Sequence, residues 1–237
     1  MRELRGARVG EEAGDTAGEN LIMRRAVRGV WPHLPVLLIG SIAVCAGAAI
    51  ATLIAPGLTP VSVLVIALLV IPPFAALIAV ANGIVVRGDA TVRQWGGSLI
   101  RSGWRAVTVA VPPVVALALL LTAVEVWRIS GQSWVLVPLG VAATVSAIGV
   151  LGLTAALPLA LERPGLRGTA LWLSALFLVA KRPLSFIAVA CLAGMGIWAA
   201  TAWTASLLLL LPAPVALVAS AAVWTSAARL GLAAPKE

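Results

Sequence analysis

The chain has 237 residues, of which 61% are hydrophobic and only 11% are charged. A soluble domain of ordinary composition has about 25% charged residues, so this composition excludes a water-soluble fold and predicts a protein whose solvent is largely lipid. The 17 Lys and Arg residues outnumber the 9 Asp and Glu residues, but they lie in short loops between apolar runs, which favours membrane orientation over nucleic-acid binding.

The chain begins with a polar, Gly-rich segment, MRELRGARVGEEAGDTAGEN. This segment lacks the apolar core of a signal peptide, and its composition is typical of disorder. We therefore predict a disordered cytoplasmic tail over residues 1–23, a membrane domain over residues 24–230 and a cytoplasmic C-terminal tail over residues 231–237.

Six apolar runs have the length of about 20 residues that a membrane-spanning helix needs. The turn between the last two runs is expected near Thr204–Ser206 or near Pro212–Pro214, and the first choice leaves a sixth span of full length. The sequence therefore predicts an all-α polytopic bundle of six transmembrane helices. The predicted spans are residues 32–55, 61–86, 106–126 and 134–161, with two further spans between residues 184 and 230.

The basic residues are distributed unequally between the two sides of this arrangement. If the N-terminus is inside, all of the 17 Lys and Arg residues except Arg128 fall on the inner side or at its interface. Because cytoplasmic loops of membrane proteins are enriched in Lys and Arg, the pattern predicts a multi-pass protein of the bacterial inner membrane with both termini in the cytoplasm.

Two of the cytoplasmic connections are expected to form short amphipathic elbow helices. In the first, Asp89 is a candidate N-cap, and Val92, Trp95 and Leu99 form an apolar stripe of the kind that lies on a membrane surface; an irregular charged loop is the alternative. A related Arg-Gly-x-Ala pattern recurs at residues 167–170. This second copy is more apolar, so it is expected either to pack against the bundle or to form an interfacial helix, and chance similarity of two loops is the alternative to a repeat. The basic residues of both elbows are expected to contact lipid head groups or a cytoplasmic partner: Arg87, Arg93, Arg101, Arg105, Lys181 and Arg182.

Acidic residues near the spans are few. Glu125 lies at the outer end of the third span, three residues before Arg128, which is the spacing of an ion pair on a helix. The alternative for this pair is a gate or a ligand contact on the outer side, because acids within membranes often mark pathways.

The remaining polar residues point to structural roles. Asn82 is expected to form a hydrogen bond between helices, and Cys45 and Cys191 are expected to be buried free thiols. His33 has no Cys, Asp or Glu beside it, so it predicts no metal site. The sequence contains no motif for phosphate binding, serine hydrolysis or zinc proteolysis, and we predict no catalytic residue, cofactor or metal.

Two segments resemble a known family. IPPFAALIAVANGIVVRGDATVRQWGGSLIRSGWRAV and ALPLALERPGLRGTALWLSALFLVAKRPLSFI are similar to the two elbow regions of the YesL-like bacterial integral membrane proteins, and the resemblance extends over residues 24–230. Genes of that family often lie beside carbohydrate uptake systems and polysaccharide-degrading enzymes. The resemblance therefore implies a non-enzymatic accessory role, with ABC transporter subunits and membrane lipids as partners.

Two alternatives to the accessory role remain. The first is a permease for a small solute, although neither elbow contains the Glu-Ala-Ala…Gly loop signature of ABC permeases. The second is an enzyme that acts on lipid, for which Glu125 and Glu162 are the available acids.

Overall fold

The computed structural model describes residues 2–203 and 206–230. Within these residues all regular elements are helices, and six of them are long and apolar enough to cross a membrane. The structure thus confirms the predicted all-α membrane bundle with six spans. The C-terminal tail predicted over residues 231–237 lies outside the described residues.

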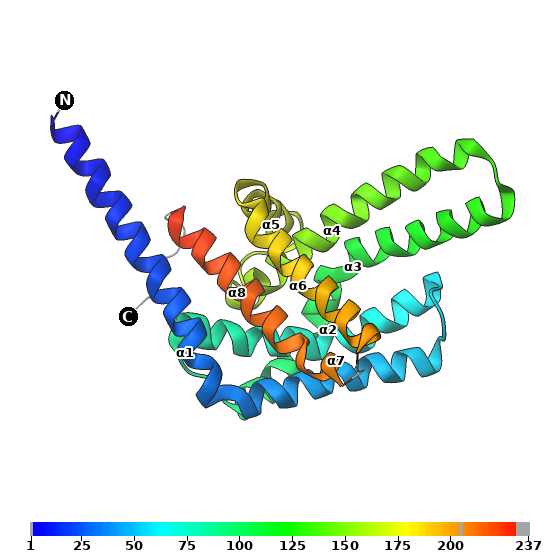
Figure 1. The fold of residues 1–237 in the computed structure, drawn as a ribbon, viewed down its shortest axis with the longest axis horizontal. Coiled ribbons are helices and arrows are strands. Elements are labelled where there is room, and N and C mark those ends of the chain that lie inside the picture. The colour runs from blue at the N-terminus through cyan, green and yellow to red at the C-terminus, as the bar shows by residue number, and fades with distance from the viewer. Residues whose placement is uncertain (1, 204–205, 231–237) are drawn as a thin grey trace.

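The first two spans form an antiparallel hairpin (Figure 1). Helix α2 (Pro60–Asn82) begins with a capping box, in which the Ser62 N–H donates to Thr59 Oγ1 at 3.1 Å and the Thr59 N–H donates to Ser62 Oγ at 2.9 Å. These bonds satisfy two amides that a helix start leaves without partners. The hairpin turn between α1 and α2 is therefore well defined.

Helix α1 (Arg2–Ile54) is longer than its apolar span, which covers Val27–Ile54. Its first part projects beyond the other helices (Figure 1). The composition predicts a disordered tail over residues 1–23, and the structure differs by continuing the helix to Arg2. A helix that is already formed in the membrane domain can extend without the cost of a new nucleus.

A π-helix, η1 (Gly83–Arg87), follows α2 directly. It ends at Gly88, whose φ of +82° is the left-handed conformation that glycine adopts readily. The chain then runs through a short loop before the next helix. The prediction that Asp89 is the N-cap of that helix is wrong: Thr91 holds this position, and its Oγ1 accepts from the Gln94 N–H at 3.2 Å. The left-handed conformation of Gly88 turns the chain out of η1 into a loop. Asp89 belongs to this loop, so the next helix begins only at Val92.

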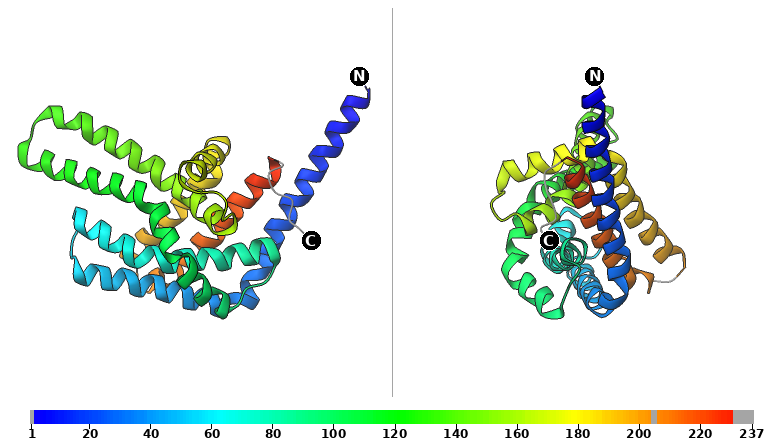
Figure 2. Two further views of the ribbon diagram at one scale, coloured as in Figure 1. Left: turned by 180° about the vertical axis from the view of Figure 1, so that it is seen from behind. Right: turned by 90° about the vertical axis from the view of Figure 1, so that its left-hand side faces the viewer.

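The first elbow is helical but it is not a separate helix. Helix α3 runs without interruption over Val92–Ser130 and includes both the elbow and the third span. Neither Gly96-Gly97 nor Pro112-Pro113 ends it, although proline removes a backbone donor and bends a helix. The ribbon of α3 changes direction along its length in Figure 2. The bend lets the elbow and the span belong to one helix.

The second half of the chain agrees more closely with the predicted elements. Helix α5 is a separate short elbow, and α6 ends at Ala202 before α7 begins at Leu207, so the turn lies in the region of the preferred choice. Thr204 and Ala205 themselves lie outside the described residues. The elements are η2 (Ser133–Val135), α4 (Leu136–Glu162), α5 (Gly168–Lys181), α6 (Pro183–Ala202), α7 (Leu207–Leu210) and α8 (Pro212–Arg229).

The core lies toward the end of the bundle that carries the basic residues. Its buried side chains come mainly from residues 75–85, 155–160 and 216–227, which belong to α2 with η1, to α4 and to α8. In contrast, the α3–α4 hairpin projects away from the α1–α2 hairpin (Figures 1 and 2). The bundle is tightly packed at the basic end and open at the other.

Candidate functional site

A buried asparagine joins three helices at the basic end. The Asn82 Nδ2 donates to the Pro158 carbonyl oxygen of α4 at 3.0 Å, and its Oδ1 accepts from the Trp224 Nε1–H of α8 at 3.0 Å. Because an indole can only donate and a carbonyl can only accept, these partners define the orientation of the amide. Asn82 is fully buried, so the predicted hydrogen bond between helices is confirmed.

The single histidine attaches α1 to the loop before α3. Its Nδ1 lies 2.8 Å from the Gly29 carbonyl oxygen, and its Nε2 lies 3.1 Å from the Ala90 nitrogen. The Ala90 amide can only donate, so Nε2 is the acceptor and Nδ1 carries the proton. Gly29 also lets α1 lie close to η1, because a Cβ there would clash with the side chain of Ile84. His33 therefore has a clear structural role.

Two of the elbow arginines contact the protein itself. Arg87 Nη1 lies 2.8 Å from Glu162 Oε1, and its Nε lies 3.8 Å from Asp89 Oδ1. Arg105 Nη2 donates toward three carbonyl oxygens of residues 163–166, at 2.8–3.4 Å. Both side chains were expected to contact lipid or a partner. In the structure they connect the first elbow to the end of α4 and to the loop that follows it.

The other four predicted contact residues lie at the surface of the elbows or near it. Arg93, Arg101 and Lys181 are exposed and Arg182 is partly buried. Arg101 also lies near a carbonyl oxygen of its own helix, and the Lys181 Nζ lies 5.6 Å from the centre of the Phe177 ring, within the range of a cation–π interaction. Their contact with lipid head groups or with a partner stays a prediction.

The ion pair between Glu125 and Arg128 has the predicted geometry. Arg128 Nη1 lies 3.2 Å from Glu125 Oε2, and the two side chains are 70% and 59% exposed, respectively. Exposed pairs of this kind contribute little to stability because water competes for both charges. The structure therefore contains the ion pair that the spacing predicts, and its place at the membrane interface stays a prediction.

We expect the substitution Glu125→Gln to change the free energy of unfolding by less than about 0.5 kcal/mol, because it removes one partner of an exposed pair. The measurement is unfolding of the purified protein by SDS in mixed micelles, followed by far-UV circular dichroism. A loss above about 1.5 kcal/mol, outside the usual range for exposed pairs, would contradict the interpretation of Glu125 as an interfacial residue.

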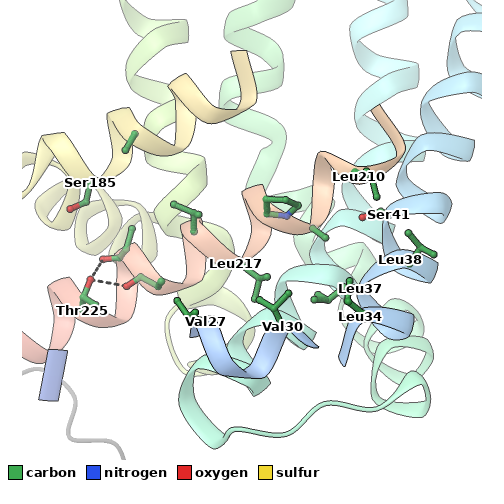
Figure 3. Close-up of a pocket in the computed structure, with 16 residues that line it drawn as sticks. Val27, Val30, Leu34, Leu37, Leu38, Ser41, Ser185, Leu210, Leu217 and Thr225 are labelled. Carbon is green, nitrogen blue, oxygen red and sulfur yellow. Dashed lines mark hydrogen bonds between the residues drawn. The ribbon is translucent and has the colours of Figure 1, made fainter. Parts of the chain in front are cut away.

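An apolar groove of about 640 Å³ lies among α1, α6, α7 and α8 (Figure 3). Its floor includes the buried Leu37, Ser41 and Leu217, while the rim residues Val27 and Leu38 are exposed. The groove thus opens at the side of the bundle. Its labelled lining residues are Val27, Val30, Leu34, Leu37, Leu38, Ser41, Ser185, Leu210, Leu217 and Thr225.

The polar atoms of the groove are few. The Thr225 hydroxyl donates to the Ala221 carbonyl oxygen of its own helix at 2.7 Å. The Ser41 hydroxyl is buried without a hydrogen-bond partner in the described part of the chain. Sequence reasoning missed this groove, and the small residues Ala221 and Ala222 on α8 are the one local signal for it.

The sequence predicts that Cys45 and Cys191 are buried free thiols, and it predicts no metal site. Both cysteines are free, but the prediction of burial is wrong: Cys191 is exposed on α6, and Cys45 is only partly buried. An apolar residue in a membrane span can face lipid or pack against protein, so its place in an apolar run does not imply burial within the protein. Among the described residues, no group of three or more His, Cys, Asp or Glu side chains is placed to hold a metal ion.

Searches against protein-family models, curated proteins and solved structures give no match to this chain. The resemblance to the YesL-like proteins stays a prediction from the two elbow segments.

Proposed function

We propose that the protein is a non-enzymatic accessory subunit of a membrane uptake system. It lies in the bacterial inner membrane with both termini in the cytoplasm. The system that its resemblance to the YesL-like proteins implies is an ABC-type carbohydrate transporter. The observation that supports an accessory role is the outer half of the α3–α4 hairpin, which has little packing against the rest of the described chain.

The outer half of this hairpin comprises residues 117–150. Within it only Val135 and Ser146 are buried. The hairpin extends away from the other helices in Figure 1, so its apolar surface is available to lipid or to another membrane protein. Its exposed large side chains include Leu119, Ile129, Trp134, Val137, Val141 and Val145.

The basic end of the same hairpin is held firmly. Asn82 binds α4, and Arg105 binds the loop after α4. A projecting pair of helices on a fixed base suits a docking element, since its orientation is set before a partner binds and less ordering is needed.

The chemistry of the groove supports an accessory role over a permease for sugars. A site for a polar ligand places several hydrogen-bonding groups around it. The groove in Figure 3 is lined mainly by aliphatic side chains, with Ser41, Ser185 and Thr225 as its hydroxyl residues. This lining suits a hydrocarbon chain better than a carbohydrate.

The test is photo-crosslinking in native membranes. A benzoylphenylalanine at Val141 or Val145 is expected to crosslink to a subunit of a transporter, which mass spectrometry identifies. The matched control is the same probe at Leu53, which is also a large, exposed apolar residue near the outer end of a span. Crosslinks only to lipid, or equal crosslinks to the subunit from Leu53, would contradict docking by the hairpin. Solute uptake by the purified protein in liposomes would then favour the permease.

A further inference from the structure

We propose that the groove among α1, α6 and α8 is a binding site for one anionic phospholipid from the leaflet at the basic end of the bundle. An acyl chain would lie along α8, and the phosphate would lie near Arg24 and Arg28 of α1. This site goes beyond the proposed accessory role and does not depend on it.

The dimensions of the groove suit an acyl chain. Along α8, the lining extends from Ala213 to Thr225, which is about 18 Å at the helical rise of 1.5 Å per residue. The hydrocarbon core of a bilayer is about 30 Å thick, so one leaflet contributes about 15 Å. A single chain of one leaflet therefore matches the length of the groove.

The exposure of the walls indicates how a lipid enters. Leu37 at the floor is 2% exposed, whereas Val27 at the rim is 63% exposed. The groove is therefore open laterally, toward the surrounding bilayer. A lipid can therefore enter the groove without leaving the membrane. Its acyl chain then lies against the floor of the groove in place of the surrounding bilayer lipid.

The hydroxyl residues are distributed unequally along the groove. Ser185 and Thr225 lie toward one end, whereas Ser41 lies near Leu38 and Leu210 toward the other end (Figure 3). The end with Ser185 and Thr225 is also the end nearest in sequence to the basic residues, since Ser185 follows Arg182 by three residues. The glycerol and ester region of a lipid fits this end.

The charge around the groove favours an anionic head group. Arg24 and Arg28 are exposed on either side of Val27 in α1, and Arg229 follows Thr225 by four residues on α8. Residues 24–54, 181–203 and 206–230 contain no Asp or Glu. The walls therefore present cations to the membrane surface, where each attracts anionic lipid. An apolar helix of a partner protein would not interact favourably with these cations, so an anionic lipid is the better occupant.

The test compares two lipids on the full-length protein. The purified, delipidated protein is titrated with phosphatidylglycerol and with phosphatidylcholine of the same acyl chains, and native mass spectrometry counts the lipids bound. We expect one phosphatidylglycerol to bind more tightly than phosphatidylcholine. The double variant Arg24→Gln/Arg28→Gln is expected to lose about 25-fold in affinity for phosphatidylglycerol, at roughly fivefold for each arginine, with little change for phosphatidylcholine.

The matched control is Arg93→Gln/Arg101→Gln, which removes the same charge from exposed residues of the first elbow. We expect a loss below about threefold, because those residues lie on the first elbow and do not flank a lining residue of the groove as Arg24 and Arg28 flank Val27, so they act only through long-range, screened attraction. Equal losses in the two double variants, or equal binding of the two lipids to the unmodified protein, would overturn the proposal.

A second variant tests the location of the acyl chain. Ala222→Phe places a large side chain in the lining and is expected to weaken both lipids at this site, whereas Ala180→Phe on the exposed surface of α5 is expected to weaken neither. Circular dichroism and size-exclusion chromatography verify that each variant is folded. Full binding of phosphatidylglycerol to a folded Ala222→Phe protein would place the lipid elsewhere and overturn the site. Crosslinking from Val141 tests the accessory role separately.

Discussion

Replacing Asn82 by leucine is expected to lower the free energy of unfolding by about 1–2 kcal/mol, although the two side chains have similar size. The substitution leaves the buried Trp224 indole N–H without its acceptor at 3.0 Å, and it removes the donor to the Pro158 carbonyl oxygen of α4. An unsatisfied buried donor costs about 1–3 kcal/mol in water-soluble proteins, and single hydrogen bonds between membrane helices contribute up to about 1.7 kcal/mol.

A double-mutant cycle separates the hydrogen bond from the change in shape. Trp224→Phe removes the donor, so Asn82→Leu is expected to cost less in that background than in the unmodified protein. The expected coupling energy is about 0.5–1.5 kcal/mol, measured by SDS unfolding in mixed micelles with far-UV circular dichroism. A coupling energy indistinguishable from zero would show that the Asn82–Trp224 bond does not hold α2 against α8.

The Asn82–Trp224 hydrogen bond is one of several contacts that connect the helices near Asn82. Asn82 is the last residue of α2, and the π-helix η1 begins immediately after it. Arg87 at the end of η1 pairs with Glu162 of α4, and the following loop donates from Ala90 to His33 of α1. Asn82 therefore belongs to a series of contacts that joins α1, α2, α4 and α8 at the basic end.

The number of spans was predictable because it depends on length and composition alone. Each apolar run is long enough to cross the hydrocarbon core, and the positions of the basic loops divide the runs. The separate α5 elbow was predictable for the same reason, since Pro164 and Gly165 precede it and Pro183 follows it. Local sequence is sufficient to predict the boundary of a helix where proline and charged residues occur together.

Continuity of α3 was not predictable from the same signals. Gly96-Gly97 and Pro112-Pro113 lie within it, and both pairs ordinarily weaken a helix. Between and beside these pairs α3 packs closely on two other helices: a Cβ at Gly103 would lie 3.3 Å from Cβ of Pro72 in α2, and a Cβ at Gly149 of α4 would lie 3.1 Å from Cβ of Pro113. Such a contact between residues far apart in sequence has no local signature.

The candidate sites show the same limit. Asn82 was recognisable as a residue that bonds between helices, but its partners lie 76 and 142 residues away. The groove forms only where α1, α6 and α8 lie side by side. The role of Arg105 depends on the loop after α4, because its side chain donates to a carbonyl oxygen of that loop. Interactions within one segment were predictable from the sequence, whereas interactions between distant segments required knowledge of the fold.

Close approach of α1 and α2 leads to the second large effect. A Cβ at Gly47 would lie 2.6 Å from the Leu69 carbonyl oxygen and 3.2 Å from its carbonyl carbon. These are backbone atoms of α2, so no side chain can rotate to make space. Gly47→Ala is therefore expected to force the helices apart, at a cost of about 1–3 kcal/mol for overpacking. Membrane helices depend on such contacts because burial from water does not drive their association.

Gly140→Ala is the matched control for this substitution. Gly140 lies inside α4, and a Cβ there would have no neighbour within 4 Å, so the variant reports only the gain in helix propensity of up to about 1 kcal/mol. SDS unfolding of both variants gives the cost of the close approach as the difference between them. If Gly47→Ala matched Gly140→Ala, the contact of α1 with α2 would not be required for stability. A large difference would indicate that the close approach of α1 to α2 at Gly47 contributes to the stability of the bundle.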